Sequence, residues 1–463
     1  MAALITIAEL VATSRAPKSI AEVTAAREVR LSRLVIGYIA MGLFFMLLPG
    51  TFLGVWNLLA ISTHRSVETV SPAWIQAHGH AQIFGWIGSF ILGIGYYSIP
   101  KLRRMRPFAL WAPWTSLVTW FSGVTLRWAA GVYEWHWRVL LPLSAGLEIF
   151  AFLIFFRIVS GHRNGAEAQP GKLNEWVVVV IAASIGWLAT LVINLLSATF
   201  LAWHAASPAL PHNFDQRFLV LETWGFLVPF IWGFSANWLP IFLGLRSLRS
   251  RHLLWAVVLN SAGVIAALFS FIVGSSFLLL GAFATVVYAL RVFEGSERAP
   301  TVRGVHASFP IFVRLAYGWP LLSAVSAIWA SLTPHSAGIC GPSRHALTVG
   351  FVALMVFCIG QRVLPAFSGM RMLFSARLMF VGQALLSIGC LFRVASEILA
   401  YQGLVRSAWS WLPVSAITEL TAVTIFALNL AITFLTARNR AELQYRNAAW
   451  SATPIATVEE GSQ

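Results

Sequence analysis

The sequence predicts an all-α protein, a polytopic transmembrane bundle of about twelve helices. Three observations lead to this fold class. Hydrophobic residues make up 58% of the 463-residue chain, charged residues only 11%, and the mean hydropathy is +0.75. The apolar residues gather in blocks of about 20, the length that crosses a bilayer. Runs such as 177–185 are apolar on every side, whereas the strands of a membrane barrel alternate.

The blocks predict twelve spans, flanked by a cytoplasmic N-terminal tail (1–33) and a cytoplasmic C-terminal tail (438–463), with the membrane domain at 34–437. No internal repeat is evident from the sequence, and the glycine- and proline-containing loop 159–174 is interpreted as a linker. The predicted spans are 34–61, 74–99, 108–128, 138–158, 175–200, 216–243, 253–273, 275–293, 313–332, 345–366, 376–400 and 412–436.

The basic residues predict the orientation of the bundle. With both termini inside, 25 of the 32 Lys and Arg residues fall on the inner side. This asymmetry is typical of multi-pass membrane proteins, and it accounts for the net charge of +15 without a nucleic-acid partner. The expected partner of the apolar surface is the lipid bilayer. The three cysteines form no CxxC pair, so neither a disulfide framework nor a thiolate metal site is predicted.

Two histidines, His78 and His80, stand near the outer start of the second span. Ser71 suits the N-cap of this helix and Pro72 its first turn. Residues two apart point about 200° away from each other on a helix, so the two imidazoles are not expected to share a metal. His78 shares a small, polar face with Gln82, which favours it as an axial haem ligand, and His80 is kept as the second candidate. That both are interface histidines, hydrogen-bonded to loops, is an equally open alternative.

The tenth span begins at a comparable depth with Arg344 and His345. Two imidazoles on different helices at one depth are what a bis-histidine haem requires. Arg344 suits a haem propionate, although an arginine that reaches toward the membrane interface is the simpler interpretation.

Acidic residues inside the spans are the next candidates, because buried carboxylates must be neutral, paired or hydrated. Glu148, Glu222 and Glu419 are predicted proton sites, and Glu397 is a further buried acid. The alternative is structural: these groups would be partners of Arg127, Arg393 or the histidines.

The local motifs resemble those of the NnrS-type nitric-oxide-response proteins, a family related to haem–copper oxidase subunit I. The similarity rests on A-H-G-H-A-Q-I-F-G in span two, D-Q-R-F with W-G-F-L-V-P in span six, and H-A-L-T-V-G from His345 to Gly350. It implies a bacterial inner-membrane protein with haem between spans two and ten, copper as a second cofactor, and nitric oxide or another small gas as its ligand.

The sequence departs from the oxidase pattern at the second metal centre. That centre needs histidines inside spans six and seven and a second one in span ten, and this chain has none there. Residues 366–369 read A-F-S-G where the family continues with His-Thr-Gly. Copper would therefore need loop histidines such as His204 or His212.

Three functions stay open at this stage. The first is a haem protein that responds to nitric oxide or detoxifies it. The second is a terminal-oxidase-like or nitric-oxide-reductase-like enzyme, so whether the protein is an enzyme is left undecided. The third is a proton-coupled secondary transporter without a cofactor. Such transporters usually show internal repeats.

Overall fold

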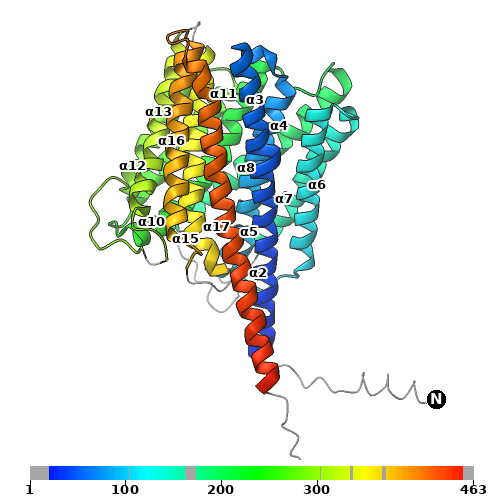
Figure 1. Cartoon of the computed structure of the whole chain (residues 1–463), viewed down its shortest axis with the longest axis vertical. Coiled ribbons are helices and arrows are strands. Elements are labelled where there is room, and N and C mark those ends of the chain that lie inside the picture. Colours follow the sequence, from blue (N-terminus) through cyan, green and yellow to red (C-terminus); the bar gives the residue numbers. More distant parts are fainter. Residues whose placement is uncertain are drawn as a thin grey trace, which may run out of the picture.

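The computed structural model describes residues 20–103, 105–161, 174–302, 304–333, 337–367 and 372–451. Every regular element within these ranges is a helix, which confirms the predicted all-helical class. Eleven helical runs in the described part of the chain are long and apolar enough to cross a membrane, as expected of a multi-pass membrane protein. They run roughly parallel in one bundle (Figure 1).

Each of the twelve predicted spans overlaps one long helical run. The run missing from the eleven is α6 (Trp111–Tyr133), in which serines, threonines and Arg127 lower the hydropathy. The outermost helices extend further than the predicted spans: the first begins at Ile20 and the last continues to Ser451. Residues 1–19, 162–173 and 452–463, which include most of the predicted N-terminal tail and linker, lie outside the described residues.

The bundle is built from three units of four spans each, which we call unit one, unit two and unit three. Unit one contains the first four spans. Its elements are α2 (Ile20–Phe45), η1 (Met46–Phe52) and α3 (Leu53–His64); the short η2 (Val67–Thr69); α4 (Pro72–His80), η3 (Ala81–Gly88) and α5 (Ser89–Leu102); α6; and α7 (Trp137–Val159).

The other two units follow the same order. Unit two consists of α8 (Glu175–His204); α9 (His212–Val220), η4 (Leu221–Leu227) and α10 (Val228–Leu243); α11 (Ser250–Leu268); and α12 (Ile272–Leu290). Unit three consists of α13 (Phe309–Leu332); η5 (Ala337–Ile339), α14 (Cys340–His345), η6 (Ala346–Ala353) and α15 (Leu354–Phe367); α16 (Ala376–Tyr401); and α17 (Ala408–Ser451).

A π-helix interrupts the second span of every unit, and it marks the units as structural repeats. The segments η3, η4 and η6 each contain a glycine that lies fifteen residues before a proline; the pairs are Gly85 and Pro100, Gly225 and Pro240, and Gly350 and Pro365. Since π-helices are rare and frequently lie at functional sites, three at one position are not a coincidence of packing. The chain therefore contains an internal repeat that was not evident from its sequence, and the prediction of none is wrong.

The same glycine lies at a close contact with the first span of its own unit. A Cβ atom on Gly85 would lie 2.7 Å from Phe45, and one on Gly350 would lie 2.4 Å from Trp319. In unit two the contact is between backbones, because a Cβ atom on Gly186 would lie 2.0 Å from the carbonyl oxygen of Gly225. First and second spans thus pack together at the π-helix in all three units.

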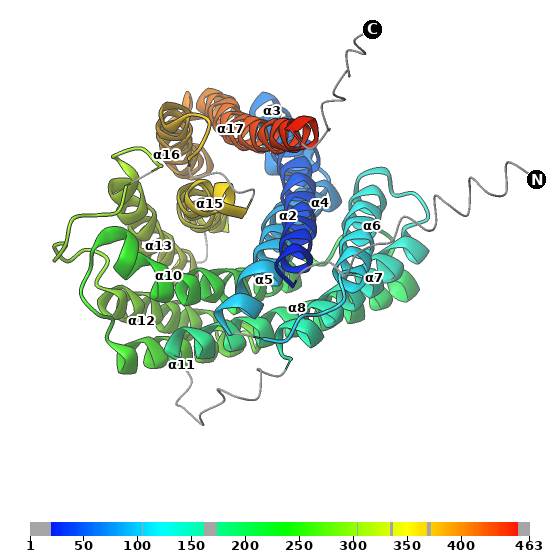
Figure 2. The ribbon, with the colours of Figure 1, turned by 90° about the horizontal axis from the view of Figure 1, so that it is seen from below.

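The third and fourth spans form the tightest helix pair of each unit, namely α6–α7, α11–α12 and α16–α17. Gly123, Gly263 and Gly389 lie at these crossings, where an added Cβ atom would come within 2.8 Å of Glu148, Leu279 and Glu419 respectively. The three pairs lie on the periphery, and α5, α10 and α15 lie nearer the middle (Figure 2).

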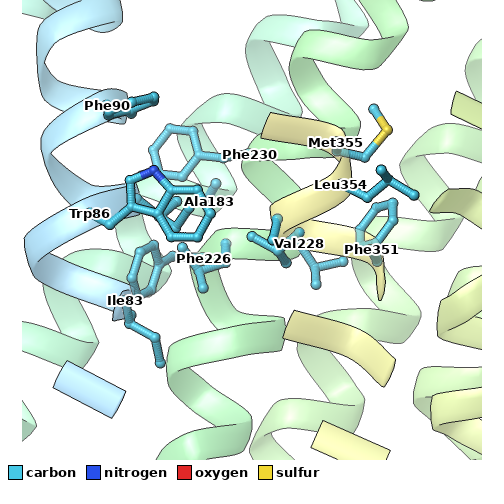
Figure 3. Close-up of a cluster of buried hydrophobic side chains, with 14 of the residues drawn as sticks. Ile83, Trp86, Phe90, Ala183, Phe226, Val228, Phe230, Phe351, Leu354 and Met355 are labelled. Carbon is cyan, nitrogen blue, oxygen red and sulfur yellow. The ribbon is translucent and has the colours of Figure 1, made fainter. Parts of the chain in front are cut away.

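Aromatic and aliphatic side chains from the second spans fill the centre of the bundle. Trp86, Phe226 and Phe351, one from each unit, lie in this cluster (Figure 3). Phe226 also stacks on Trp187, with ring centroids 5.2 Å apart. The second spans therefore meet through apolar contacts, and His78, His80 and His345 lie in the turns just before the π-helices.

Candidate functional site

The second span begins as the sequence predicts. Ser71 is the N-cap of α4, its side chain accepts a hydrogen bond from the Ala73 amide, and Pro72 follows at the first position. His78 and His80 then point to different neighbours, as their spacing requires: His78 contacts the first span, and His80 contacts the fourth.

The His78 imidazole lies against the π-helix η1. Its Nδ1 is 2.8 Å from the carbonyl oxygen of Gly50, so Nδ1 carries the proton and donates it, and Nε2 keeps its lone pair. A Cβ atom on Gly54 would lie 2.7 Å from the ring, so this glycine allows the imidazole to approach the helix. Gln82, one turn on, bonds Thr51 of the same π-helix, as expected for the polar face that it shares with His78.

His80 forms a buried pair with Glu148. Its Nε2 donates to the Glu148 carboxylate at 2.8 Å, and both side chains are almost fully buried. The ring stacks on Phe84 with centroids 4.4 Å apart. Because Nε2 is occupied by a carboxylate and the ring by an aromatic neighbour, His80 is the poorer of the two predicted haem ligands.

Arg127 and Glu222 lie beside this pair without contacting it or each other. Both are buried, and Arg127 interacts electrostatically with Glu148, Glu222 and Asp215. Neither makes a side-chain hydrogen bond or a salt bridge within 4.0 Å to a described residue. The predicted proton site Glu222 is thus a buried carboxyl group with an electrostatic partner and no direct one.

His345 lies in a network with two residues of the eleventh span. Its Nδ1 is 3.0 Å from the Glu397 carboxylate, and its Nε2 is 3.3 Å from the Arg393 guanidinium. Arg393 Nε is in turn 2.9 Å from the other oxygen of Glu397. Nδ1 therefore donates to Glu397, and the lone pair of Nε2 faces the arginine. This network supports the structural interpretation of Glu397.

Arg344 connects spans six and ten. Its guanidinium donates to the side-chain oxygen of Gln216 at 2.7 Å and to the carbonyl oxygen of Cys340 at 3.2 Å. It also acts electrostatically on Asp215 and Glu397. The side chain reaches toward a neighbouring span, and its roles at a propionate or at the membrane interface stay predictions.

Glu419 occupies the position in unit three that Glu148 occupies in unit one. It is half-buried, interacts electrostatically with Arg393 and Glu397, and has one buried oxygen, Oε1, without a hydrogen-bond partner. Its role as a proton site stays a prediction, as does that of Glu222.

His78 and His345, from spans two and ten, come into the same region of the protein. His345 and Arg393 are the groups whose charge acts on His78, which places all three within electrostatic range. In both imidazoles Nδ1 is hydrogen-bonded to an acceptor, the backbone carbonyl of Gly50 for His78 and the Glu397 carboxylate for His345.

The residues considered for copper do not form a site in the described part of the chain. His204 lies exposed at the end of α8, where Nδ1 is 3.2 Å from the carbonyl oxygen of Phe200, and His212 is exposed at the start of α9. No group of three or more His, Cys, Asp or Glu side chains is placed to hold a metal ion within the described residues. The three cysteines are free.

From the sequence, Arg127, Arg393 and Glu397 were expected only as structural partners. The correspondence between residues of unit one and residues of unit three was missed. His80 and His345 each precede the π-helix glycine by five residues; Arg127 and Arg393 each follow the crossing glycine by four. The signal was present as H-A-x-x-x-G in spans two and ten and as L-P-x-S-A-x-x-E in spans four and twelve.

No protein-family model matches this chain, and no curated protein is significantly similar to it. What the protein binds and does therefore has to be argued from its own residues.

Proposed function

We propose that the protein is a haem-binding protein of the bacterial inner membrane, with both termini in the cytoplasm, and that His78 and His345 hold the haem iron. The proposal rests on one observation: both imidazoles have Nδ1 fixed by an acceptor, so Nε2 is the atom that would bind iron. Nε2 of His78 has no protein partner among the described residues, whereas Nε2 of His345 accepts from Arg393 at 3.3 Å and would exchange this contact for the iron. Histidines that ligate metals donate their other ring N–H to a carbonyl or a carboxylate in the same way, which fixes the tautomer and raises the basicity of the ligand.

The surrounding charges suit the anionic edge of a haem. Arg393 and Arg344 are the cations next to this pair, and both are suited to propionate groups, which arginine binds through two parallel hydrogen bonds. When bound, the haem would supply gas binding and one-electron chemistry. The chain itself supplies the two imidazoles, the Glu397 carboxylate that is hydrogen-bonded to His345, and the apolar cluster of the second spans.

Nitric oxide is the gas that we propose as the ligand, in a response or detoxification role, and it would bind in place of one of the two histidines. This part of the proposal rests on the resemblance of the span-two and span-ten motifs. The oxidase-like alternative is not favoured, because spans six and seven have no histidine in their interiors and His345 is the only one in span ten. Copper forms no part of the proposal.

The test is the reduced-minus-oxidised absorbance spectrum of the detergent-purified protein, produced with ample haem. We expect a low-spin haem signal in the wild type and in His204→Ala, the matched control at an exposed position, and its loss in His78→Ala and His345→Ala. Addition of nitric oxide should shift the wild-type spectrum. A wild-type protein without haem absorbance, or a signal that survives both substitutions, would refute the assignment.

A proton-coupled transporter without a cofactor is the second candidate. It is favoured by the repeated units and by the buried pair of Arg127 and Glu222, which interact without direct contact. A colourless protein that acidifies the lumen of proteoliposomes, and loses this activity on Glu222→Gln, would establish it in place of the haem protein.

A further inference from the structure

A polar recess lies at the outer end of the bundle, where the first and last spans meet. It has a volume of about 360 Å³ and is lined by Ser62 and Arg65 at the end of α3 and by Arg406, Ser407, Trp409 and Ser410 at the start of α17. The upper ends of α3 and α17 lie side by side in both ribbon views (Figures 1 and 2). The recess therefore lies on the seam between unit one and unit three.

The walls of this recess are held together independently of any ligand. The Ser62 hydroxyl donates to the carbonyl oxygen of Trp409 at 2.7 Å and so ties one wall to the other. Below them, Val55 and Leu58 of α3 pack against Leu412 and Ala416 of α17 in a small apolar cluster. The seam beneath the recess is thus held by contacts within the protein, and Arg406 and Ser407 line the recess from the turn that precedes α17.

Two guanidinium groups share the recess, and neither has a partner there. Arg65 and Arg406 form no side-chain hydrogen bond and no salt bridge with any described residue. Only seven of the chain's 32 basic residues fall on the predicted outer side, and two of the seven line this one recess. Like charges placed together repel each other, and a bound anion removes that repulsion.

The backbone at Arg65 gives a second reason to look for a ligand. Arg65 caps α3 in the left-handed region, with φ of 53°, a position where glycine or asparagine is usual. An arginine here carries a conformational cost that a glycine would not, and it presents its side chain to the recess.

Apolar side chains continue from the recess along the same two helices. Leu59 of α3 and Val414 and Ile417 of α17 are exposed, as expected of side chains that face acyl chains. A basic recess above an exposed apolar strip matches a molecule with a phosphate head and a hydrocarbon tail. Tryptophans such as Trp409 also favour this level of the membrane.

We propose that the recess binds the phosphate of an anionic phospholipid from the outer leaflet, and that the lipid clamps the seam between unit one and unit three. Arg65 and Arg406 bind the phosphate oxygens, the arginine fork being suited to phosphate. The acyl chains lie along α3 and α17. Because the seam also joins spans one and two to spans ten to twelve, the lipid stabilises the bundle where its first and last helices meet.

The first experiment counts bound lipid by native mass spectrometry of the full chain, released from nanodiscs of phosphatidylcholine with a minor share of phosphatidylglycerol. We expect one phosphatidylglycerol to stay on the wild type and to be lost from the double variant Arg65→Gln/Arg406→Gln. Arg138→Gln, which removes one charge elsewhere on the outer side, is the control and should retain it. Equal retention by the double variant and the wild type would overturn the proposal.

The second experiment separates a lipid from a free anion. Thermal unfolding of delipidated protein in detergent is followed with added phosphatidylglycerol, phosphatidylcholine or inorganic phosphate. We expect phosphatidylglycerol alone to raise the Tm of the wild type, with a smaller rise in Arg65→Lys/Arg406→Lys and none in the glutamine variant. A full rise with inorganic phosphate, or an equal rise with phosphatidylcholine, would show that the recess does not select an anionic lipid.

Discussion

Unit one and unit three carry the same three ionisable residues at corresponding positions and use them differently. In unit one, His80 bonds Glu148 of the fourth span and is buried under Phe84. In unit three, the corresponding acid, Glu419, makes no hydrogen bond to the histidine. His345 instead donates a hydrogen bond to Glu397 of the third span. Unit two has Val220, Ala267 and Leu279 at these positions.

One residue accounts for the difference. Glu397 lies one turn beyond Arg393, and the corresponding residue in unit one, one turn beyond Arg127, is Gly131. The extra carboxylate holds Nδ1 of His345 and leaves Nε2 to Arg393, whereas His80, without such an acid on the third span, directs Nε2 to Glu148 on the fourth span. The two histidines thus differ in the span that supplies their acid: the fourth span for His80, which forms a buried pair, and the third span for His345, the proposed ligand.

The largest expected effect is on stability, and it tests the comparison by making the same substitution in both units. Glu148→Leu removes a single carboxylate with two partners. This group accepts the hydrogen bond of His80, and of all the charged groups it has the strongest electrostatic effect on buried Arg127. Breaking a buried pair in this way costs about 3–5 kcal/mol of unfolding free energy. Glu419→Leu, at a half-buried residue without a hydrogen bond or salt bridge, should cost less than about 1 kcal/mol.

Denaturant unfolding in detergent micelles, followed by tryptophan fluorescence, measures both losses. Glu148→Gln is the matched control: it keeps an acceptor for His80, and its loss should fall between the other two. Similar losses for Glu148→Leu and Glu419→Leu would mean that the two units are equivalent after all.

The second effect concerns haem affinity and follows from the Glu397 network. Glu397→Gln keeps an oxygen for Nδ1 of His345 but removes the charge that also holds Arg393. Loss of such a supporting group typically weakens metal binding by about 10–100-fold. Titration of the apoprotein with haem, followed by absorbance, gives the affinity. Glu148→Gln should leave it unchanged, and an equal loss in that variant would assign the haem to unit one.

The sequence was sufficient for the fold class and for part of the site. Length and hydropathy predicted the spans, and the two-residue spacing correctly separated His78 from His80. Glu148 and Glu397 each pair with a histidine, as the structural alternative expected, and the role of Glu148 as a proton site stays a prediction. These inferences depend only on local helix geometry and on the cost of burying a charge.

The rest depended on distances that a sequence does not contain. A helical wheel assumes 3.6 residues per turn, and the π-helices at Ala81–Gly88 and Ala346–Ala353 break that register just beyond the histidines. The repeat was missed because its matching residues are few and widely separated. Which acid reaches which histidine is decided by how closely neighbouring spans approach.

The smallest expected effect tests how closely α4 and α6 approach at Gly131, the position in unit one that corresponds to Glu397. A Cβ atom on Gly131 would lie 3.2 Å from the Ala77 methyl group and 3.3 Å from the carbonyl oxygen of Ala73, so α4 packs directly on the α6 backbone. Gly131→Ala should therefore cost about 1 kcal/mol through overpacking. Gly146→Ala on α7, where nothing lies within 4 Å of the new atom, should gain about 0.5–1 kcal/mol from helix propensity alone.

Paired unfolding measurements on these two alanine variants decide whether the contact is as close as we infer. If Gly131→Ala is destabilised and Gly146→Ala is not, unit one has no room beside α4 for a second carboxylate, and His80 can bond only to the fourth span. If both variants are equally stable, lack of space does not explain why residue 131 is not an acid. Gly131→Glu should then form a hydrogen bond with His80 in place of Glu148, as Glu397 does with His345.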